Sequence, residues 1–330
     1  MTNGDNSPYN SNPNIPGQTK QTPLTCTGHT RPVVDLDFSS ATDDGFFIVS
    51  ACKDGKPMLR QGNTGDWVGT FLGHKGAVWC VSSNSNATRA CTGSADFSCK
   101  IWDCVSGNEM GELPHDHIVR ACAFSPDGNK LATGCQDKQV RVFNLENLPS
   151  QMFSLDPYII ASGHKSTVKK LCWIDNNTFL TASDDKTVKK WDISEDCGKM
   201  IYDRSFDDSV SDVSITNNVV TVVSGKSVYF FENGINSNPT KTYTLPTKLN
   251  SASLHQDGKV FVAGGEDLKV YKMNFETGEE MDSYKGHFGP VHIVRFSPDG
   301  KLYASGSEDG TIRLWQMVPG EAYGLWKGRQ

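Results

Sequence analysis

Residues 289–316 read GPVHIVRFSPDGKLYASGSEDGTIRLWQ, and this stretch decides the fold. Three short runs, VHIVRF, KLYASGS and TIRLWQ, alternate apolar with polar residues or are largely apolar, and the turn sequences SPDG and EDG separate them. Runs of this length bounded by Gly, Pro and Asp predict β-strands joined by tight turns. No amphipathic stretch with a helical period competes with them.

The same pattern recurs along the chain. Gly-His dipeptides mark four copies, and His115 takes the same place after Pro114 in a fifth. The five His residues are His29, His74, His115, His164 and His287, and a Val follows each of them four residues later. Their successive spacings are 45, 41 and 49 residues, and the last gap of 123 residues holds two more copies, with Phe206 and Leu245 at the His position. Seven units of about 42 residues, each with four strands, are the pattern of propeller blades.

Composition excludes several classes of function. Lys and Arg number 32 and Asp and Glu 38, so the net charge of −6 provides no footprint for duplex DNA or an anionic membrane. No run approaches 18 apolar residues, and the first twenty residues lack the features of a signal peptide, which predicts a soluble cytosolic or nuclear protein without membrane insertion. The ten Cys residues form no C-x-x-C pair, which favours reduced, mostly buried thiols over disulfides or a zinc site.

Three segments carry a resemblance to a known family. TGSADFSCKIWD at 92–103, TASDDKTVKKWD at 181–192 and SGSEDGTIRLWQ at 305–316, together with the Gly-His dipeptides, resemble the WD-repeat family. The resemblance implies an all-β fold, a single seven-bladed β-propeller around a central channel, over residues 21–330. Residues 1–20, rich in Asn, Pro, Gly and Ser, are expected to be a disordered tail.

Ring closure requires one terminus to supply a strand, because an open propeller leaves exposed strand edges. In the family the N-terminus provides the outer strand of the last blade. QTPLTCTGH at 21–29 matches WVGTFLGH at 67–74 and is the favoured candidate, although GEAYGLWKG at 320–328 matches the same template.

The His, Ser or Thr, Asp and Trp of a unit predict a chain of hydrogen bonds that locks the blade. The three complete sets are His74, Thr92, Asp96 and Trp102 in blade two, His164, Thr181, Asp185 and Trp191 in blade four, and His287, Ser305, Asp309 and Trp315 in blade seven. A catalytic Ser-His-Asp triad is the alternative, but a catalytic site is needed once and this triplet recurs.

Enzymatic chemistry is not expected. Five of the eight His residues belong to the repeated motif, and only His117, His255 and His292 remain for a metal or for a catalytic site in the channel. The interpretation is therefore a protein without cofactor, metal or catalytic residues.

Arg60 interrupts the pattern. In SACKDGKPMLRQ at 50–61 it stands where other blades carry Trp, and where blades three and six carry Phe143 and Met273. Two interpretations remain open. The guanidinium replaces the indole inside the blade, bonding Asp54 and lying against a ring, or blade one exposes Arg60 as a binding feature.

The resemblance also implies a partner surface, since WD-repeat proteins usually meet partners at the top rim of the channel through two positions in each blade. The first position corresponds to Val34, Trp79, Arg120, Lys169, Ser211, Asn250 and His292, and the second to Lys53, Ala95, Gln136, Asp184, Glu266 and Glu308. With Arg60, the partner-binding candidates are Lys53, Trp79, Arg120, Gln136, Lys169, Asp184, Glu266, His292 and Glu308. An exposed Trp79 beside Arg120 would have the composition of an interface hot spot, while a Trp79 packed between blades would belong to the core.

Further segments resemble one subfamily of WD-repeat proteins. These are residues 50–79, VAGGEDLKVYK at 262–272 and YGLWK at 323–327. This resemblance implies a non-enzymatic scaffold of the cytoplasm and nucleus in the survival-of-motor-neuron (Gemin-type) complex, which assembles spliceosomal small nuclear ribonucleoproteins. It also implies a role in transforming-growth-factor-β receptor kinase signalling through Smad proteins. Any association with RNA would be indirect. A WD-repeat subunit of translation initiation factor three is the alternative.

Overall fold

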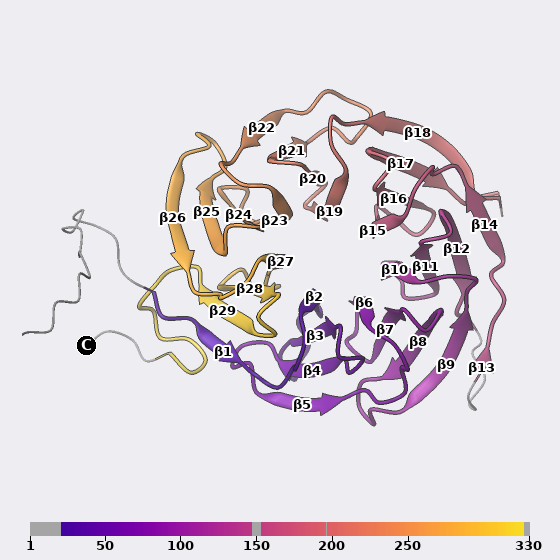
Figure 1. The fold of residues 1–330 in the computed structure, drawn as a ribbon, viewed down its shortest axis with the longest axis horizontal. Coiled ribbons are helices and arrows are strands. Elements are labelled where there is room, and N and C mark those ends of the chain that lie inside the picture. Colours follow the sequence, from indigo (N-terminus) through magenta and orange to yellow (C-terminus); the bar gives the residue numbers. More distant parts are fainter. Residues whose placement is uncertain (1–20, 147–152, 196, 327–330) are drawn as a thin grey trace, which may run out of the picture.

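The computed structural model describes residues 21–146, 153–195 and 197–326, and strands are its only regular elements there. Seven sheets surround a central channel, so the fold is the seven-bladed WD-repeat β-propeller that the repeat predicts (Figure 1). The expectation for residues 1–20 lies outside the described residues. Within the described ranges, no helix could span a membrane.

Each blade is a twisted sheet whose first strand faces the channel and whose last strand lies at the circumference. Blade one contains β2 (Val33–Phe38), β3 (Phe47–Cys52), β4 (Met58–Gln61) and β5 (Trp67–Thr70). Blade two contains β6 (Val78–Ser83), β7 (Arg89–Ser94), β8 (Ser98–Asp103) and β9 (Glu109–Pro114), to which β13 (Phe153–Ser154) is added. Blade three contains β10 (Val119–Phe124), β11 (Lys130–Cys135), β12 (Gln139–Asn144) and β14 (Ile159–Ser162).

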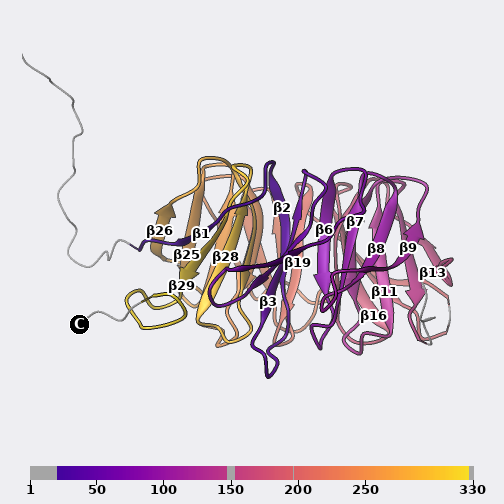
Figure 2. The same cartoon turned by 90° about the horizontal axis from the view of Figure 1, so that it is seen from below.

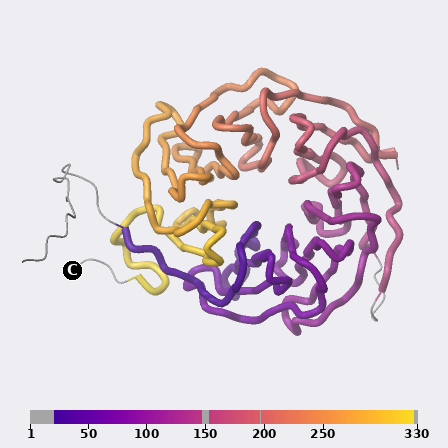
Figure 3. Tube along the Cα trace, in the orientation of Figure 1, coloured from indigo at the N-terminus to yellow at the C-terminus, as the bar shows by residue number. Residues whose placement is uncertain are grey.

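The second half of the ring repeats this order (Figure 3). Blade four contains β15 (Val168–Trp173), β16 (Thr178–Ser183), β17 (Thr187–Asp192) and β18 (Lys199–Ser205). Blade five contains β19 (Val210–Thr216), β20 (Val219–Ser224), β21 (Ser227–Phe231) and β22 (Lys241–Thr244). Blade six contains β23 (Leu249–Leu254), β24 (Val260–Gly265), β25 (Lys269–Asn274) and β26 (Glu280–Lys285). Blade seven contains β27 (Val291–Phe296), β28 (Leu302–Ser307), β29 (Ile312–Gln316) and β1 (Leu24–Cys26).

The hydrophobic core lies between neighbouring blades. One cluster joins Cys80 and Ile101 of blade two to Phe124 and Leu131 of blade three, and similar clusters follow around the ring. The middle strands are covered on both faces, as in β28, where every residue is buried. Seen edge-on, neighbouring blades pack against each other around the ring (Figure 2).

The N-terminal segment closes the ring. Strand β1 pairs with β29 in antiparallel register, with Leu24 opposite Leu314, as the favoured prediction states. The C-terminal segment forms an isolated bridge between Tyr323 and Trp326 instead, and Trp326 packs against the core cluster beneath β1. Both ends thus meet beside blade seven (Figure 1).

A fifth strand in blade two was not predicted. Strand β13 comes from the connection between β12 and β14 and pairs parallel to the outer strand β9. The ring of Phe153 lies where a Cβ at Gly111 would sit, within 2.5 Å of it, so a larger residue at 111 would displace the ring.

Candidate functional site

The seven innermost strands share a bulge near the start. In each of them the register with the second strand shifts immediately after the first residue, which is Leu249 in blade six and Val in the other six blades. A bulge leaves one residue unpaired and redirects its side chain. The bulge residues, called rim residues below, are Val34, Trp79, Arg120, Lys169, Ser211, Asn250 and His292.

All seven rim residues line one cavity of about 200 Å³ at one end of the channel, the upper mouth. They are the residues that the family resemblance assigned to the first position of each blade. Lys53, from the second position, also lines the mouth, whereas Gln136 and Glu266 are exposed but do not line it. Whether these residues bind a partner stays a prediction.

Most charged groups at the rim are paired with one another. Glu308 accepts from His292 at 2.6 Å and lies 3.5 Å from the Lys53 ammonium. Burial would raise the pKa of Glu308, but these two neighbours lower it overall. Asp184 pairs with Lys169 at 2.5 Å, and the Asn250 amide donates to Glu266 at 3.3 Å. The carboxylates of Glu266 and Glu308, two of the partner-binding candidates, are therefore engaged by neighbours within the rim.

Trp79 combines features of both earlier interpretations. Its side chain is partly buried and lines the upper mouth. The Arg120 guanidinium lies 3.8 Å from the centre of its rings, and the Lys53 ammonium 5.4 Å from it. The indole Nε1–H is buried and has no hydrogen-bond partner among the described residues. Trp79 is thus a platform beneath two cations, neither a fully exposed side chain nor a core residue.

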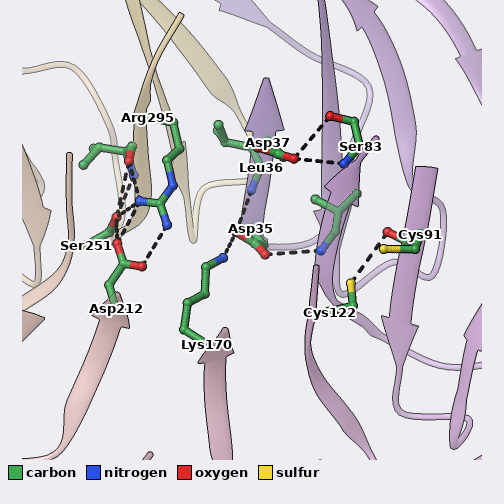
Figure 4. A network of polar contacts seen from close by, with 12 residues as sticks. Asp35, Leu36, Asp37, Ser83, Cys91, Cys122, Lys170, Asp212, Ser251 and Arg295 are labelled. Carbon is green, nitrogen blue, oxygen red and sulfur yellow. Dashed lines mark hydrogen bonds and ion pairs between the residues drawn. The ribbon is translucent and has the colours of Figure 1, made fainter. Parts of the chain in front are cut away.

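Below the upper mouth, charged side chains from blades that are not neighbours meet in the channel (Figure 4). Arg295 donates to both carboxylate oxygens of Asp212 at 2.8 Å, and Ser251 donates to Asp212 at 2.6 Å. Lys170 reaches Asp35 at 2.5 Å. We call Asp35, Asp37, Lys170, Asp212 and Arg295 the charge belt.

A second cavity, of about 710 Å³, lies at the other end of the channel. Asp35 and Asp212 line the upper mouth, Asp37 and Arg295 line the second cavity, and Lys170 lines both. The charge belt therefore lies between the two cavities. Burial alone would raise the pKa of Asp212, but the Arg295 guanidinium outweighs it and lowers the value. Asp37 has no such partner in contact, and desolvation raises its pKa although Ser83 donates two hydrogen bonds to it.

The charge belt was not predicted from the sequence. A signal was present, because VVDLDF at 33–38 places Asp35 and Asp37 inside a strand that must be covered on both faces. Their partners could not be found in the same way, since Lys170 lies 135 residues further along the chain.

The blade residues predicted to form a lock do lie in contact. In blade two His74 lies 2.8 Å from Asp96 and 2.7 Å from Thr92, to which Trp102 Nε1–H donates at 2.8 Å. Blade four repeats this with His164, Asp185, Thr181 and Trp191, and blade seven with His287, Asp309, Ser305 and Trp315. These chains are enclosed within single blades, away from the upper mouth.

The titratable groups of the blade-four lock favour one protonation state. Burial lowers the pKa of His164, and although Asp185 opposes this effect, the imidazole stays neutral at pH 7. Burial would raise the pKa of Asp185, yet hydrogen bonds from the Thr187 hydroxyl, the Lys165 amide and His164 lower it to about 2. The neutral ring therefore donates from Nδ1 to Asp185 and accepts at Nε2 from the Thr181 hydroxyl.

Arg60 corrects the prediction that blade one exposes a binding feature. Its side chain is buried, with 4% of the residue's surface exposed. It also does not bond Asp54, which instead accepts from His29 at 3.0 Å. Arg60 donates to the backbone carbonyl of Gly65 at 3.0 Å and to that of Thr27. It replaces the indole as a structural group and cannot reach a partner at the rim.

One group of potential metal ligands occurs within the described residues, namely His29, Cys52 and Asp54. Its chemistry argues against a metal site. Burial raises the pKa of the Cys52 thiol to about 12, and the thiol donates to the Arg31 carbonyl at 3.0 Å. A thiol must lose its proton to bind a metal. His29 and Asp54 instead form the lock of blade one with the Ser50 hydroxyl, which lies 2.8 Å from His29 Nε2.

Comparison with known proteins agrees with the fold. The family model described as WD domain, G-beta repeat matches residues 65–103, 107–144, 156–192 and 278–316. The human protein named serine-threonine kinase receptor-associated protein is 52% identical over 310 residues, covering 93% of this chain and 86% of the human one. The protein of the same name from Dictyostelium discoideum is 44% identical over 296 residues, 89% of this chain and 98% of its own. Eukaryotic translation initiation factor 3 subunit I from Rattus norvegicus is 27% identical over 322 residues, 90% of this chain and 97% of its own.

Proposed function

The chain belongs to the WD-repeat family and, within it, to the serine-threonine kinase receptor-associated proteins, and from this we propose that it is a non-enzymatic docking platform for protein partners. One observation carries the proposal: the identity of 52% over 93% of the chain to the human protein of that name. Identity this extensive supports the same fold in both proteins.

The setting that we favour is the survival-of-motor-neuron complex and its assembly of spliceosomal small nuclear ribonucleoproteins. That assembly is a general cellular task and depends on protein docking. The net charge of −6 supports an indirect association with RNA, through protein partners, in the cytoplasm and nucleus. The relative's printed name supports a second setting, association with receptor serine-threonine kinases, where Smad proteins would be the expected partners.

The blade locks support a platform without chemistry of its own. Their His, hydroxyl and carboxylate groups satisfy one another inside each blade, so none is presented to a substrate. The upper mouth offers a polar, bulged rim that is held by seven rigid sheets. Such a rim suits recognition of a protein segment, because docking residues on a rigid scaffold lose little conformational entropy.

The test is quantitative mass spectrometry of proteins that co-purify with the tagged chain from a native lysate at moderate salt. Stoichiometric survival-of-motor-neuron and Sm proteins are expected. Co-purification of initiation-factor-three subunits would instead support the function of the more distant relative, subunit I of that factor. The absence of any stoichiometric partner would contradict the proposal of a docking platform.

Two variants show where the partner docks. Trp79→Ala removes the aromatic platform of the upper mouth, whereas Trp67→Ala removes an indole that is 61% exposed on the outer strand β5. We expect Trp79→Ala to lose the partner and Trp67→Ala to keep it, with both proteins folded by circular dichroism. The reverse result would place docking at the circumference.

A further inference from the structure

The upper mouth is positively charged although the whole chain is negative. Besides His292, four cations and two carboxylates line it: Lys53, Arg120, Lys169 and Lys170 against Asp35 and Asp212. Three of the cations are ion-paired: Lys53 with Glu308 at 3.5 Å, Lys169 with Asp184 at 2.5 Å and Lys170 with Asp35 at 2.5 Å. Asp212 is engaged by Arg295. Arg120 remains as the exception.

The Arg120 guanidinium makes no hydrogen bond and no ion pair with any other described residue; it stacks on the Trp79 ring at 3.8 Å. Burial lowers its pKa, and only the more distant Asp184 and Cys80 oppose this effect. A guanidinium stacked by its face keeps its N–H donors at the edge, in one plane and pointing outward. The stack on Trp79 therefore holds the guanidinium N–H groups of Arg120, which we call the Arg120 fork, unpaired at the upper mouth.

A second unpaired donor lies in the same place. The Trp79 Nε1–H is buried without a partner in the described chain. An unpaired buried donor costs roughly 1–3 kcal/mol, so native proteins usually pair such groups. Arg120 and Trp79 both line the upper mouth, so two donors without a partner in the described chain lie together there.

The size of the mouth limits what could fill it. Its volume is about 200 Å³, below the roughly 300–1,000 Å³ of ordinary small-molecule sites. A side chain fits this space better than a metabolite does. Single-stranded nucleic acid would need aromatic rings with free faces, whereas the Trp79 ring is covered by Arg120.

We propose that the upper mouth receives a glutamate or aspartate side chain from an acidic segment of a partner protein, with its carboxylate bound by the Arg120 fork. Planar carboxylate and planar guanidinium match in a bidentate pair. The Trp79 ring holds Arg120 in place, and the nearby Lys53 adds charge. This inference rests on the proposed function, since it names the chemistry of the partner that the platform would dock.

The experiment is a titration of the isotope-labelled full chain, followed through the seven indole N–H signals of its seven Trp residues. Trp79→Phe assigns the signal of Trp79. The probe is a short capped peptide of alternating glutamate and glycine, and the matched peptide carries glutamine in place of glutamate. We expect the glutamate peptide to shift the Trp79 signal in a saturable way and the glutamine peptide to leave it unchanged.

Arg120→Gln should weaken the glutamate peptide roughly tenfold or more, the value of a lost charge-assisted pair. Arg89→Gln is the matched control, because Arg89 begins β7 at the opposite end of blade two. Undisturbed signals of the other indoles show that each variant is folded. Equal shifts with both peptides, no shift at millimolar peptide, or equal loss in both variants would overturn the proposal, as would a Trp79 shift produced by oligouridylate RNA alone.

Failure of this inference can be told from failure of the proposed function. If stoichiometric partners co-purify equally with the wild-type chain and Arg120→Gln, the platform stands and the carboxylate site does not. If no partner co-purifies with the wild-type chain, the platform itself is wrong, whatever the peptides do.

Discussion

Arg60 is a buried cation at a position that other blades give to an indole. The Trp102 indole of blade two donates one hydrogen bond inside its own blade. Arg60 instead reaches the Thr27 carbonyl, just beyond the ring-closing strand β1, and the Gly65 carbonyl in the β4–β5 connection. Arg60 therefore replaces the indole's hydrogen bond within the blade by a tie between blade one and the segment that leaves blade seven, while His29, Ser50 and Asp54 keep the rest of the lock.

Arg60→Met should reduce the free energy of unfolding by about 1–3 kcal/mol, because two partly enclosed carbonyls lose a charged donor. Urea denaturation followed by fluorescence measures the loss. Arg89→Met is the control, and its midpoint should hardly move. An unchanged midpoint for Arg60→Met, or loss of captured partners without loss of stability, would restore the binding interpretation.

His115 is the lock histidine of blade three and has lost its carboxylate partner. It contacts Thr133 at 2.8 Å and donates from Nδ1 to the Leu113 carbonyl, while Asp137 is taken by Arg141. Burial is the main cause that lowers its pKa to about 4; Arg141 adds to this, and the Leu113 carbonyl, Asp137 and Asp116 oppose it. His115 is therefore neutral in the folded chain over a range where it is charged in the unfolded one.

The lowered pKa of His115 makes stability depend on pH with a defined sign. His115 takes up a proton near pH 6.5 in the unfolded chain but only near pH 4 in the folded chain. The stability that the neutral His115 contributes is therefore complete above pH 6.5 and is lost as the pH falls toward 4. Between pH 7.5 and pH 5 it amounts to about 2 kcal/mol. His115→Gln should reduce the pH dependence of the unfolding free energy by about that amount, and an identical dependence in both proteins would contradict it.

At the scale of the element, the bulge near the start of each innermost strand creates the candidate site. Regular pairing would direct alternate residues into the blade interfaces. The extra residue breaks this alternation seven times and gathers the rim residues at the upper mouth. Their side chains can therefore vary from Val34 to Arg120 without disturbing the core beneath them.

The locks of blades three and four form a matched pair for measurement. Thr181 serves both His164 and Trp191, whereas Thr133 contacts His115 and, at 3.5 Å, the Arg141 carbonyl but accepts from no ring N–H, because Phe143 carries none. Thr181→Val leaves two buried groups unpaired and Thr133→Val leaves one. We expect Thr181→Val to cost about 1–3 kcal/mol more, measured by urea denaturation at pH 7.5; equal costs would mean that the indole N–H contributes little.

At the scale of the whole molecule, two devices hold the ring. Strand β1 pairs with β29, so that the first described strand of the chain completes the sheet of its last blade. The charge belt links blades that are not neighbours in the ring, joining blade one to blade four through Asp35 and Lys170, and blade five to blade seven through Asp212 and Arg295 (Figure 4).

Asp212→Asn should reduce the unfolding free energy by about 3–5 kcal/mol, because it leaves Arg295 charged and poorly paired in the channel. Combining Asp212→Leu with Arg295→Met should recover most of this loss, since apolar residues of similar volume often replace a buried ion pair at little cost. Urea denaturation of both variants provides the comparison. A double variant as unstable as Asp212→Asn would point to the Ser251 hydrogen bond as the stabilising contact instead.

Features that lie within one unit could be read from the sequence. The spacing of His29 and its counterparts predicts the number of blades, because a repeat that cannot bury its own faces must stack on its neighbours. The pairing within each lock could be predicted as well, since His164 and Asp185 are only 21 residues apart, inside one sheet. These relations follow from short-range periodicity and turn chemistry.

Only the tertiary structure decided how distant units meet. Arg295 and Asp212 are 83 residues apart, and Lys170 and Asp35 are 135 residues apart, so their pairing depends on closure of the ring and not on any period. The parallel strand β13 and the turn of Arg60 toward Thr27 have the same origin. The sequence by itself determined the blades and their locks, whereas the closed ring determined the upper mouth and the charge belt, because side chains from different blades converge only after the sheets have closed around the channel.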